Sequence, residues 1–327
     1  MPDISIIIPS SRNKDLISCL KSIYQQSFKN FEVIVICDKT LEIPEYDNLK
    51  ILQVSELNPA YRRNLGVKYA QGEILAFIDD DAIAETDWLE NAWKYLDKNK
   101  EICAIGGPDP INLDAPFLEK VSNVLLENKY LGSGVLSHSG YTKIKILKSA
   151  SALSLCNLFV RKEVFNKIGG FNEGIGYGGE DTEFMYLLMK KLNCKIVYNP
   201  YIKVYHKKRK FGLPYLKQRL KFRINNGKMI FVYPGMYLKN AKFVLFLFAV
   251  TSFLILSIIN PIVFSAGIIS YFIITFLISL KYIIKDPRFI ILPFAFFIQH
   301  SVYYAGIIIG LSNVFQYKKL RKIRRHF

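Results

Sequence analysis

Two long apolar runs in the C-terminal third constrain the fold of this chain more than any other feature. Residues 243–280 and 289–311 are almost continuously apolar, whereas residues 1–235 alternate short β-branched runs with polar helical stretches. Runs of this length match the apolar thickness of a lipid bilayer. We therefore expect four parts: a soluble domain (1–210), a basic interfacial segment (211–241), a transmembrane segment of two to three helices (242–312) and a basic tail (313–327).

The charges are distributed as unevenly as the apolar residues. The net charge is +17, but residues 1–183 carry 26 acidic and 20 basic side chains, and residues 184–327 carry 24 basic side chains and one acid, Asp286. Basic residues beside apolar spans mark the cytoplasmic side of membrane proteins and bind anionic lipid headgroups. This pattern favours membrane lipids over nucleic acid as partners. It predicts a multi-pass protein of the cell membrane whose soluble domain and tail face the cytosol.

The cysteines and the N-terminus fit the same compartment. The five cysteines show neither a C-x-x-C pair nor metal-ligand spacing, so we expect them to be reduced structural thiols. They are Cys19, Cys37, Cys103, Cys156 and Cys194. Met1 leads directly into the strand-like run Ile4–Ile8 without a basic and apolar leader. We therefore expect no signal peptide to carry the domain outward.

Strands and helices alternate through the first 210 residues. The expected strands are 4–9, 31–37, 73–78, 154–160, 195–198 and 202–205, and the expected helices are 14–26, 58–70, 86–98, a short one from 162 and one from about 181. The alternation predicts an α/β, Rossmann-like domain with a parallel sheet, in which ligands bind beyond the carboxyl ends of the strands. Residues 106–150 look irregular and are expected to form a loop region over a site.

Three carboxylates follow one of the predicted strands. Asp79, Asp80 and Asp81 come directly after the apolar run Ile74–Ile78. Carboxylates at such an edge are costly without a cation, and they hold Mg²⁺ or Mn²⁺ while a diphosphate supplies further oxygens. The alternative is an acidic cap for the following helix.

A glycine turn delivers two more acids to the start of a predicted helix. Gly178 and Gly179 precede Glu180 and Asp181. Glycine permits close approach of the backbone to a substrate, and an acid at this position can deprotonate an acceptor hydroxyl as a general base. Helix capping is again the alternative.

Four motifs occur in the order found in a known family. They are the opening run Ile6–Ser10, the segment Ala60–Gly66, the aspartates after Ile78, and Gly169–Phe171 leading to Gly179–Asp181. With these motifs, residues 3–210 resemble the inverting glycosyltransferase family 2, which has the GT-A fold. The resemblance implies a UDP- or GDP-sugar donor and a Mg²⁺ or Mn²⁺ cofactor.

The resemblance also implies roles for residues of the donor site. Ser10 and Arg12 would line the nucleotide pocket, and Asp38 and Arg63 would contact the base. The chain departs from the family at Cys37, which stands where the family often has the first of two aspartates.

Within the acidic motifs, the resemblance assigns the metal and the base. Asp81 would be the metal ligand, Asp79 would lie nearer the ribose or the sugar, and Asp80 would belong to the same donor-binding set. Asp181 would be the catalytic base, with Glu180 as the second catalytic carboxylate.

Two further sites lie in the basic half of the chain. His206 stands where related enzymes place a residue near the diphosphate or the metal, and imidazole can ligate Mn²⁺. A solvated histidine in a basic run is the alternative. The segment Gln218–Phe222 resembles the Gln-x-x-Arg-Trp signature of processive family members, with Lys221 and Phe222 substituted. We expect it to be a basic interfacial helix.

The transmembrane segment permits two topologies. Lys242–Ile259 and Ile262–Leu280 are each long enough to span a bilayer, with a hairpin at Asn260-Pro261. The third run, 289–311, is interrupted by Gln299-His300-Ser301. Either it spans as a third helix, or it is re-entrant or interfacial, turning at its polar centre so that the tail returns to the cytosol. We favour the second topology.

These observations predict an enzyme that transfers a sugar, with inversion, to a hydroxyl of a lipid-linked or surface-glycan acceptor. The layout resembles membrane-anchored exopolysaccharide-type glycosyltransferases. One alternative is a polyprenyl-phosphate sugar synthase, but its phosphate acceptor is already ionised and needs no catalytic base. The other is a non-catalytic membrane sensor of nucleotide sugars.

Overall fold

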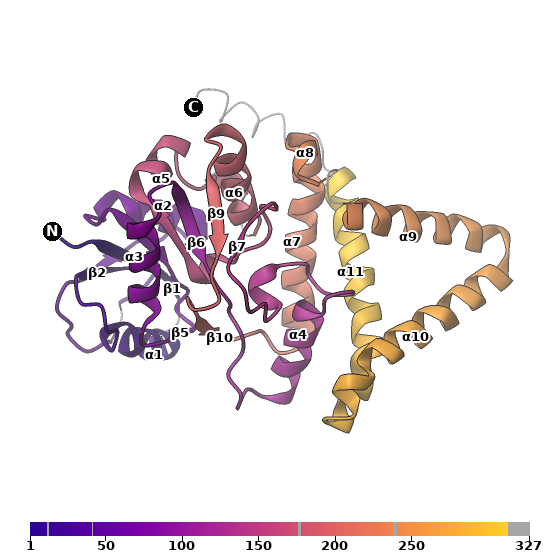
Figure 1. Cartoon of the computed structure of the whole chain (residues 1–327). Helices are drawn as coiled ribbons and strands as arrows, with labels where there is room; N and C mark the ends of the chain where they lie inside the picture. The colour runs from indigo at the N-terminus through magenta and orange to yellow at the C-terminus, as the bar shows by residue number, and fades with distance from the viewer. Residues whose placement is uncertain (12, 41, 176–177, 238–240, 313–327) are drawn as a thin grey trace. The chain divides into compact units, whose positions relative to one another are not determined.

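The computed structural model describes residues 1–11, 13–40, 42–175, 178–237 and 241–312 (Figure 1). The chain divides into two compact units. The sheet unit comprises Met1–Ala115 and Leu126–Lys208. The helical unit comprises Pro116–Leu125 and the chain from Arg209 onward.

Ten strands form two sheets within the sheet unit. The strands are β1 (Ile4–Ser10), β2 (Phe31–Cys37), β3 (Leu49–Gln53), β4 (Ile74–Phe77), β5 (Ala82–Ala84), β6 (Ile102–Gly106), β7 (Lys145–Ile146), β8 (Leu158–Arg161), β9 (Lys195–Tyr198) and β10 (Val204–His206). Eight of them make one sheet in the order β3-β2-β1-β4-β8-β6-β9-β7, and β10 pairs with β5 in a second, antiparallel sheet.

The described residues also form α-helices in both units. The α-helices are α1 (Asn13–Tyr24), α2 (Pro59–Tyr69), α3 (Trp88–Lys98), α4 (Phe117–Glu127), α5 (Lys162–Ile168), α6 (Glu180–Lys191), α7 (Leu213–Val232), α8 (Pro234–Tyr237), α9 (Ala241–Ile259), α10 (Pro261–Ile283) and α11 (Leu292–Ser312). Short 3-10 turns lie at Leu136–His138, Leu155–Asn157, Glu173–Ile175 and Pro287–Ile291.

The central strands are largely apolar because helices cover both faces of the sheet. On one face, the buried side chains of Ile4, Ile6 and Ile8 belong to the same core cluster as Leu16 of α1 and Trp88 of α3. Alternate strand residues point to the opposite face, where α2 packs. A Cβ at Gly66 of α2 would lie only 2.7 Å from the Ile7 side chain, so glycine permits this close approach.

Aromatic residues fill the second face next to α2. The Phe77 ring of β4 lies 5.8 Å from that of Phe165 and 5.1 Å from that of Phe171, and Phe171 lies 4.8 Å from Phe184 of α6. Clustered rings of this kind stabilise a fold beyond their buried area. This packing holds the first turn of α6 near the C-terminal end of β4. The predicted site residues Glu180 and Asp181 lie in that first turn, and Asp79, Asp80 and Asp81 follow β4.

The predicted α/β fold is present, but its sheet is mixed. Strands β1, β2, β3 and β4 are parallel as expected, whereas β8 runs antiparallel to β4 and β6. The strand expected at 154–160 begins only at Leu158, after a 3-10 turn. The expectation that 106–150 is irregular was wrong for residues 117–127, which form α4 because Val121 and Leu125 bury one helical face.

The expectation of five reduced thiols was also wrong. Cys103 of β6 and Cys194, which follows α6, form a disulfide with their Cα atoms 5.7 Å apart. The two residues are 91 positions apart in the sequence. The pair forms because β6 and β9 are parallel neighbours in the sheet, and the turn that precedes β9 lies beside the start of β6. Cys19, Cys37 and Cys156 are free and buried.

In the helical unit, α7 and α11 pack at very short range. A Cβ at Gly227 of α7 would lie 2.9 Å from the Cα of Gly310, and a Cβ at Gly306 of α11 would lie 2.6 Å from the Cβ of Arg223. Only glycine allows two helix backbones to approach so closely. The guanidinium of Arg223 also lies 3.8 Å from the centre of the Tyr303 ring.

The expected turn at Gln299-His300-Ser301 is absent, because α11 continues through these residues without a break. Gln299 is fully buried, accepts a hydrogen bond from the Tyr215 hydroxyl of α7, and donates one to the Leu125 carbonyl at 3.2 Å. The Tyr271 hydroxyl lies 2.9 Å from His300 Nδ1. These partners satisfy the polar groups within a regular helix, so no reversal of the chain is needed.

Two described helices are long and apolar enough to cross a membrane, judged by length and composition. They are Pro261–Ile283 and Pro287–Ser312, and a shorter apolar helix, Phe248–Ile259, precedes them. The α9–α10 hairpin carries large exposed apolar side chains near its turn, among them Ile258 and Ile262. Large exposed apolar surfaces are typical of contact with lipid or with another protein.

Candidate active site

The acidic motif and His206 meet at one edge of the sheet unit. Asp79, Asp80 and Asp81 follow β4, and the β5–β10 pair places His206 opposite Ala82. His206 Nε2 lies 3.1 Å from Asp81 Oδ1 and 3.9 Å from Asp79 Oδ2. One ligand atom from each of these three side chains lies within 4.8 Å of the others. Two carboxylates and an imidazole at this spacing suit a divalent cation such as Mn²⁺.

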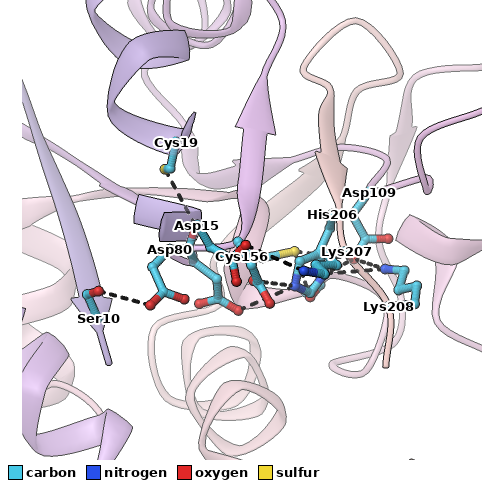
Figure 2. A network of polar contacts seen from close by, with 12 residues as sticks. Ser10, Asp15, Cys19, Asp80, Asp109, Cys156, His206, Lys207 and Lys208 are labelled. Atoms are coloured by element: carbon cyan, nitrogen blue, oxygen red, sulfur yellow. Dashed lines mark hydrogen bonds and ion pairs between the residues drawn. The ribbon is translucent and has the colours of Figure 1, made fainter. Parts of the chain in front are cut away.

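Asp80 points away from that cluster. Its Oδ2 accepts hydrogen bonds from Ser10 Oγ at 2.9 Å and from the Ser11 amide at 3.0 Å, and Asp80 is only 4 % exposed (Figure 2). Asp79 to Ala82 form a turn, closed by a hydrogen bond from the Ala82 amide to the Asp79 carbonyl at 3.1 Å, in which Asp79 and Asp81 face the histidine and Asp80 does not. Asp80 therefore positions the chain at the end of β1, where Ser10 lies.

Two consecutive arginines of α2 take different partners. Arg63 is buried, and its guanidinium reaches Asp79 Oδ1 at 2.8 Å and Glu180 Oε1 at 3.3 Å. Arg62 lies 3.6 Å from Asp38 Oδ1 and donates a hydrogen bond to the Ser10 carbonyl at 2.7 Å. The structure thus brings Arg62, rather than Arg63, next to Asp38, and Arg63 joins the two acidic motifs.

Of the donor-pocket residues named from the sequence, Arg12 lies outside the described residues. Ser10 and Asp38 both contact Arg62, so these two residues do lie in one place. Sequence reasoning missed Arg62, although it belongs to the same Ala60–Gly66 motif.

The glycine turn holds Glu180 and Asp181 at the first turn of α6. Gly178 and Gly179 have φ angles of 92° and 108°, which favour glycine, and the Gly178 amide donates to Glu180 Oε2 at 3.0 Å. Burial and the charge of Asp181 raise the pKa of Glu180 to about 7, although Arg63 opposes the shift. Burial also raises the pKa of Asp181, against hydrogen bonds from Thr182.

The two carboxylates differ in their surroundings. Glu180 is 6 % exposed and holds Arg63, whereas Asp181 is half-buried and accepts hydrogen bonds from the amide and hydroxyl of Thr182. A general base must reach the proton that it removes. Of the two carboxylates, Asp181 is the more exposed, and Glu180 is the one paired with Arg63.

A second polar cluster lies behind His206, and sequence reasoning missed it. Asp109 is fully buried, and its Oδ2 lies 3.1 Å from Lys208 Nζ, 3.3 Å from Cys156 Sγ, 3.4 Å from His138 Nε2 and 3.7 Å from His206 Nδ1. Burial by itself raises the pKa of Asp109, but the charges of His138 and Lys208 outweigh it and hold that pKa well below the usual range.

Two family models match this chain. A model described as "Glycosyl transferase family 2" matches residues 5–169, and one described as "N-terminal domain of galactosyltransferase" matches residues 136–209. The chain belongs to glycosyltransferase family 2. The family assignment that the motif order predicted is thereby confirmed.

Relatives among characterised and named proteins support the same assignment. The chain is 28 % identical over 196 residues to glycosyltransferase AglE of Haloferax volcanii, which covers 55 % of this chain and 59 % of AglE. It is 22 % identical over 208 residues to a glucosyl-dolichyl phosphate glucuronosyltransferase of the same organism, covering 58 % of this chain and 63 % of the relative. The match thus spans less than two thirds of either relative.

A solved structure resembles the chain over most of its length. The mannosyltransferase PcManGT of Pyrobaculum calidifontis, solved in complex with GDP-Man and Mn²⁺, superimposes with a TM-score of 0.58 at 15 % identity, covering 96 % of this chain and 87 % of that one. At this identity the likeness concerns the fold. The mixed α/β sheet of the family 2 chain is therefore of the GT-A type.

Proposed function

We propose that this family 2 protein is an inverting, metal-dependent glycosyltransferase that moves a sugar from a nucleotide-sugar donor to a hydroxyl acceptor. One observation carries the proposal. The cluster of Asp79, Asp81 and His206 is joined by Arg63 to Glu180 at the start of α6. In this proposal, a site for a donor diphosphate and a site for an acceptor base would lie on either side of one guanidinium.

On the donor side, Asp81 and His206 would hold Mg²⁺ or Mn²⁺, with Asp79 beside them. The ion would stabilise the negative charge that develops on the leaving nucleoside diphosphate. The donor-binding set would also include Ser10 and Asp38, with Asp80 holding the end of β1. PcManGT binds GDP-Man and Mn²⁺, which supports a UDP- or GDP-sugar donor for this chain.

On the acceptor side, Asp181 would remove the proton of the attacking hydroxyl. Attack on the anomeric carbon from the face opposite the diphosphate forms the glycosidic bond and inverts the configuration. Asp181 is half-buried, and its pKa is raised above the usual value, which suits a base. A base argues for an alcohol acceptor over a phosphate, which needs none, and therefore against a polyprenyl-phosphate sugar synthase.

The helical unit supports the proposed acceptor class. The exposed apolar helices would hold the chain in a membrane, where a lipid-linked or surface-glycan acceptor is found. One relative is named for action on a glucosyl-dolichyl phosphate, and another, 31 % identical over 113 residues, is the amylovoran biosynthesis glycosyltransferase AmsB of Erwinia amylovora. Both names support an acceptor of this kind.

The packing of α11 bears on the membrane topology. Along residues 299–310, α11 lies against α7, and α7 carries five basic side chains and no acid (Lys217, Arg219, Lys221, Arg223 and Lys228). If α11 crossed the bilayer, it would take these charges with it, and each costs at least about 2.5 kcal/mol at the bilayer centre. We therefore propose that the α9–α10 hairpin enters the membrane, that α11 stays at its surface with α7, and that the catalytic unit and the tail face the cytosol.

A screen of nucleotide sugars tests the proposed activity. The purified full chain is incubated in detergent with UDP- and GDP-sugars, and released nucleoside diphosphate is measured with Mn²⁺ and with excess chelator. We expect release from at least one donor, abolished by chelator and by Asp81→Ala. Full release in excess chelator would overturn metal dependence. No release from any donor would favour the alternative of a membrane sensor.

A further inference from the structure

The cluster around Asp109 lies outside the residues assigned to donor, metal or base, yet it contacts His206 directly (Figure 2). Backbone hydrogen bonds hold the chain at His206 on both sides. Its amide donates to the Pro110 carbonyl at 2.8 Å, and the amide of Lys207 donates to the Asp81 carbonyl at 3.2 Å. The segment that bears Asp109 therefore runs alongside β10, on the side opposite β5.

The two nitrogens of the His206 ring face different groups. Nε2 faces Asp81 Oδ1 at 3.1 Å, within the proposed metal cluster. Nδ1 faces Lys208 Nζ at 3.3 Å and Asp109 Oδ2 at 3.7 Å. A nitrogen that binds a metal carries no proton, so a ligating Nε2 leaves the single proton of the neutral ring on Nδ1. An ammonium cannot accept that proton in a hydrogen bond, whereas a carboxylate can.

We propose that Asp109 is the positioning residue for the metal site: its buried carboxylate, 3.7 Å from Nδ1 of His206 in this structure, would accept the Nδ1 hydrogen bond of the ring when Nε2 holds the ion, and so present Nε2 to it. This inference rests on the proposed metal site. Carboxylates commonly orient metal-binding histidines in this way, fixing both the tautomer and the direction of the ring. Lys208 balances the charge that makes a buried carboxylate possible.

Three observations support this role over a purely structural ion pair. Asp109 is fully buried, and its Oδ1 has no hydrogen-bond partner among the described residues, so the carboxylate keeps unused acceptor capacity. The segment before it is closely packed: a Cβ at Gly107 would lie 1.8 Å from the Ile202 carbonyl oxygen. Asn157 also donates to the Pro108 carbonyl at 3.0 Å, which holds the residue adjoining Asp109.

Mn²⁺ affinity of the full chain, measured without any nucleotide, tests the proposal. The free Mn²⁺ signal is followed by electron paramagnetic resonance during titration of the protein in detergent. We expect Asp109→Asn to weaken Mn²⁺ binding by about 10- to 100-fold, the usual effect of losing a partner of a metal-binding histidine. Lys208→Met removes a nearby cation and should not weaken binding.

The double variant Asp109→Asn/Lys208→Met separates the two explanations. The double variant removes the Asp109 carboxylate together with the Lys208 ammonium, so neither charge is left buried and unpaired. It therefore tests the role of Asp109 even if the Asp109→Asn variant alone fails to fold. We expect its Mn²⁺ affinity to stay as weak as that of Asp109→Asn. Affinity equal to wild type in the double variant would show that Asp109 only neutralises Lys208, and it would overturn the proposal.

The same titration distinguishes this inference from the proposed function. Asp81→Ala should abolish Mn²⁺ binding. If wild type binds Mn²⁺ and Asp81→Ala does not, but Asp109→Asn binds as wild type does, then the metal site stands and the role of Asp109 is wrong. If wild type does not bind Mn²⁺, both are wrong.

Discussion

Replacing Arg63 by methionine should destabilise the sheet unit more than any single surface change. Arg63 is 5 % exposed, and it holds Asp79 at 2.8 Å and Glu180 at 3.3 Å. Removing one partner of a buried ion pair costs about 3–5 kcal/mol, because a charge is left buried and unpaired. Glu180 can escape part of this cost by taking up a proton, so we expect a loss near about 3 kcal/mol.

The assay is thermal unfolding of the full chain, followed by circular dichroism at neutral pH. For a domain of this size about 3 kcal/mol corresponds to a fall in Tm of roughly 6–12 °C. The matched control is Lys94→Met, which breaks the exposed Lys94–Glu90 pair and should barely change Tm. Arg63→Met/Glu180→Gln removes the stranded carboxylate and should regain part of the loss. A Tm for Arg63→Met within error of the control would refute the reasoning.

Three further predictions concern the base, the helical unit and the topology. Burial raises the pKa of Asp181, and a base acts only when it is deprotonated. We therefore expect kcat/KM to fall with decreasing pH at a pH above about 4, the ordinary pKa of aspartate. A fall in kcat/KM only at or below about pH 4 would contradict this prediction. Gly227→Leu forces apart α7 and α11, and it should lower stability by about 1–3 kcal/mol or more in thermal unfolding; an unchanged Tm would contradict the close packing. Cysteines introduced into the tail and into residues 284–286, which follow α10, should be labelled only from the cytosolic side of sealed cells, and labelling of the tail from outside would show that α11 spans.

Much of the sheet unit could be predicted from local sequence. Strands β1 and β2 were found nearly to the residue because both of their faces are buried and their sequences are mostly apolar. Strand direction could not be found in this way. Nothing in the residues of β8 shows that it runs antiparallel to β4, because direction depends on the connection and not on composition. The edge strand β3 was missed because its half-exposed residues show no apolar run.

The candidate site was likewise predictable only where its residues stand in local sequence motifs. The acidic residues 79–81 and 180–181 stand in local motifs, and the order of these motifs along the chain was enough to predict them as site residues. Their partners are determined by packing over long distances in the chain. Which of Arg62 and Arg63 reaches Asp38 depends on the rotation of α2, and the contact of Asp109 with His206 joins residues that are 97 positions apart. The disulfide of Cys103 was missed for the same reason.

Donor binding and sugar transfer, measured on one preparation of Asp181→Asn, test the central claim most directly. The claim is that one site has a donor side built on Asp81 and His206 and an acceptor side built on Asp181. The account predicts nucleotide-sugar affinity close to wild type by calorimetry, with transfer reduced by about 10²- to 10⁴-fold. Active Asp181→Asn beside inactive Glu180→Gln would contradict the assignment of the base, and lost donor binding in Asp181→Asn would contradict the division of the site.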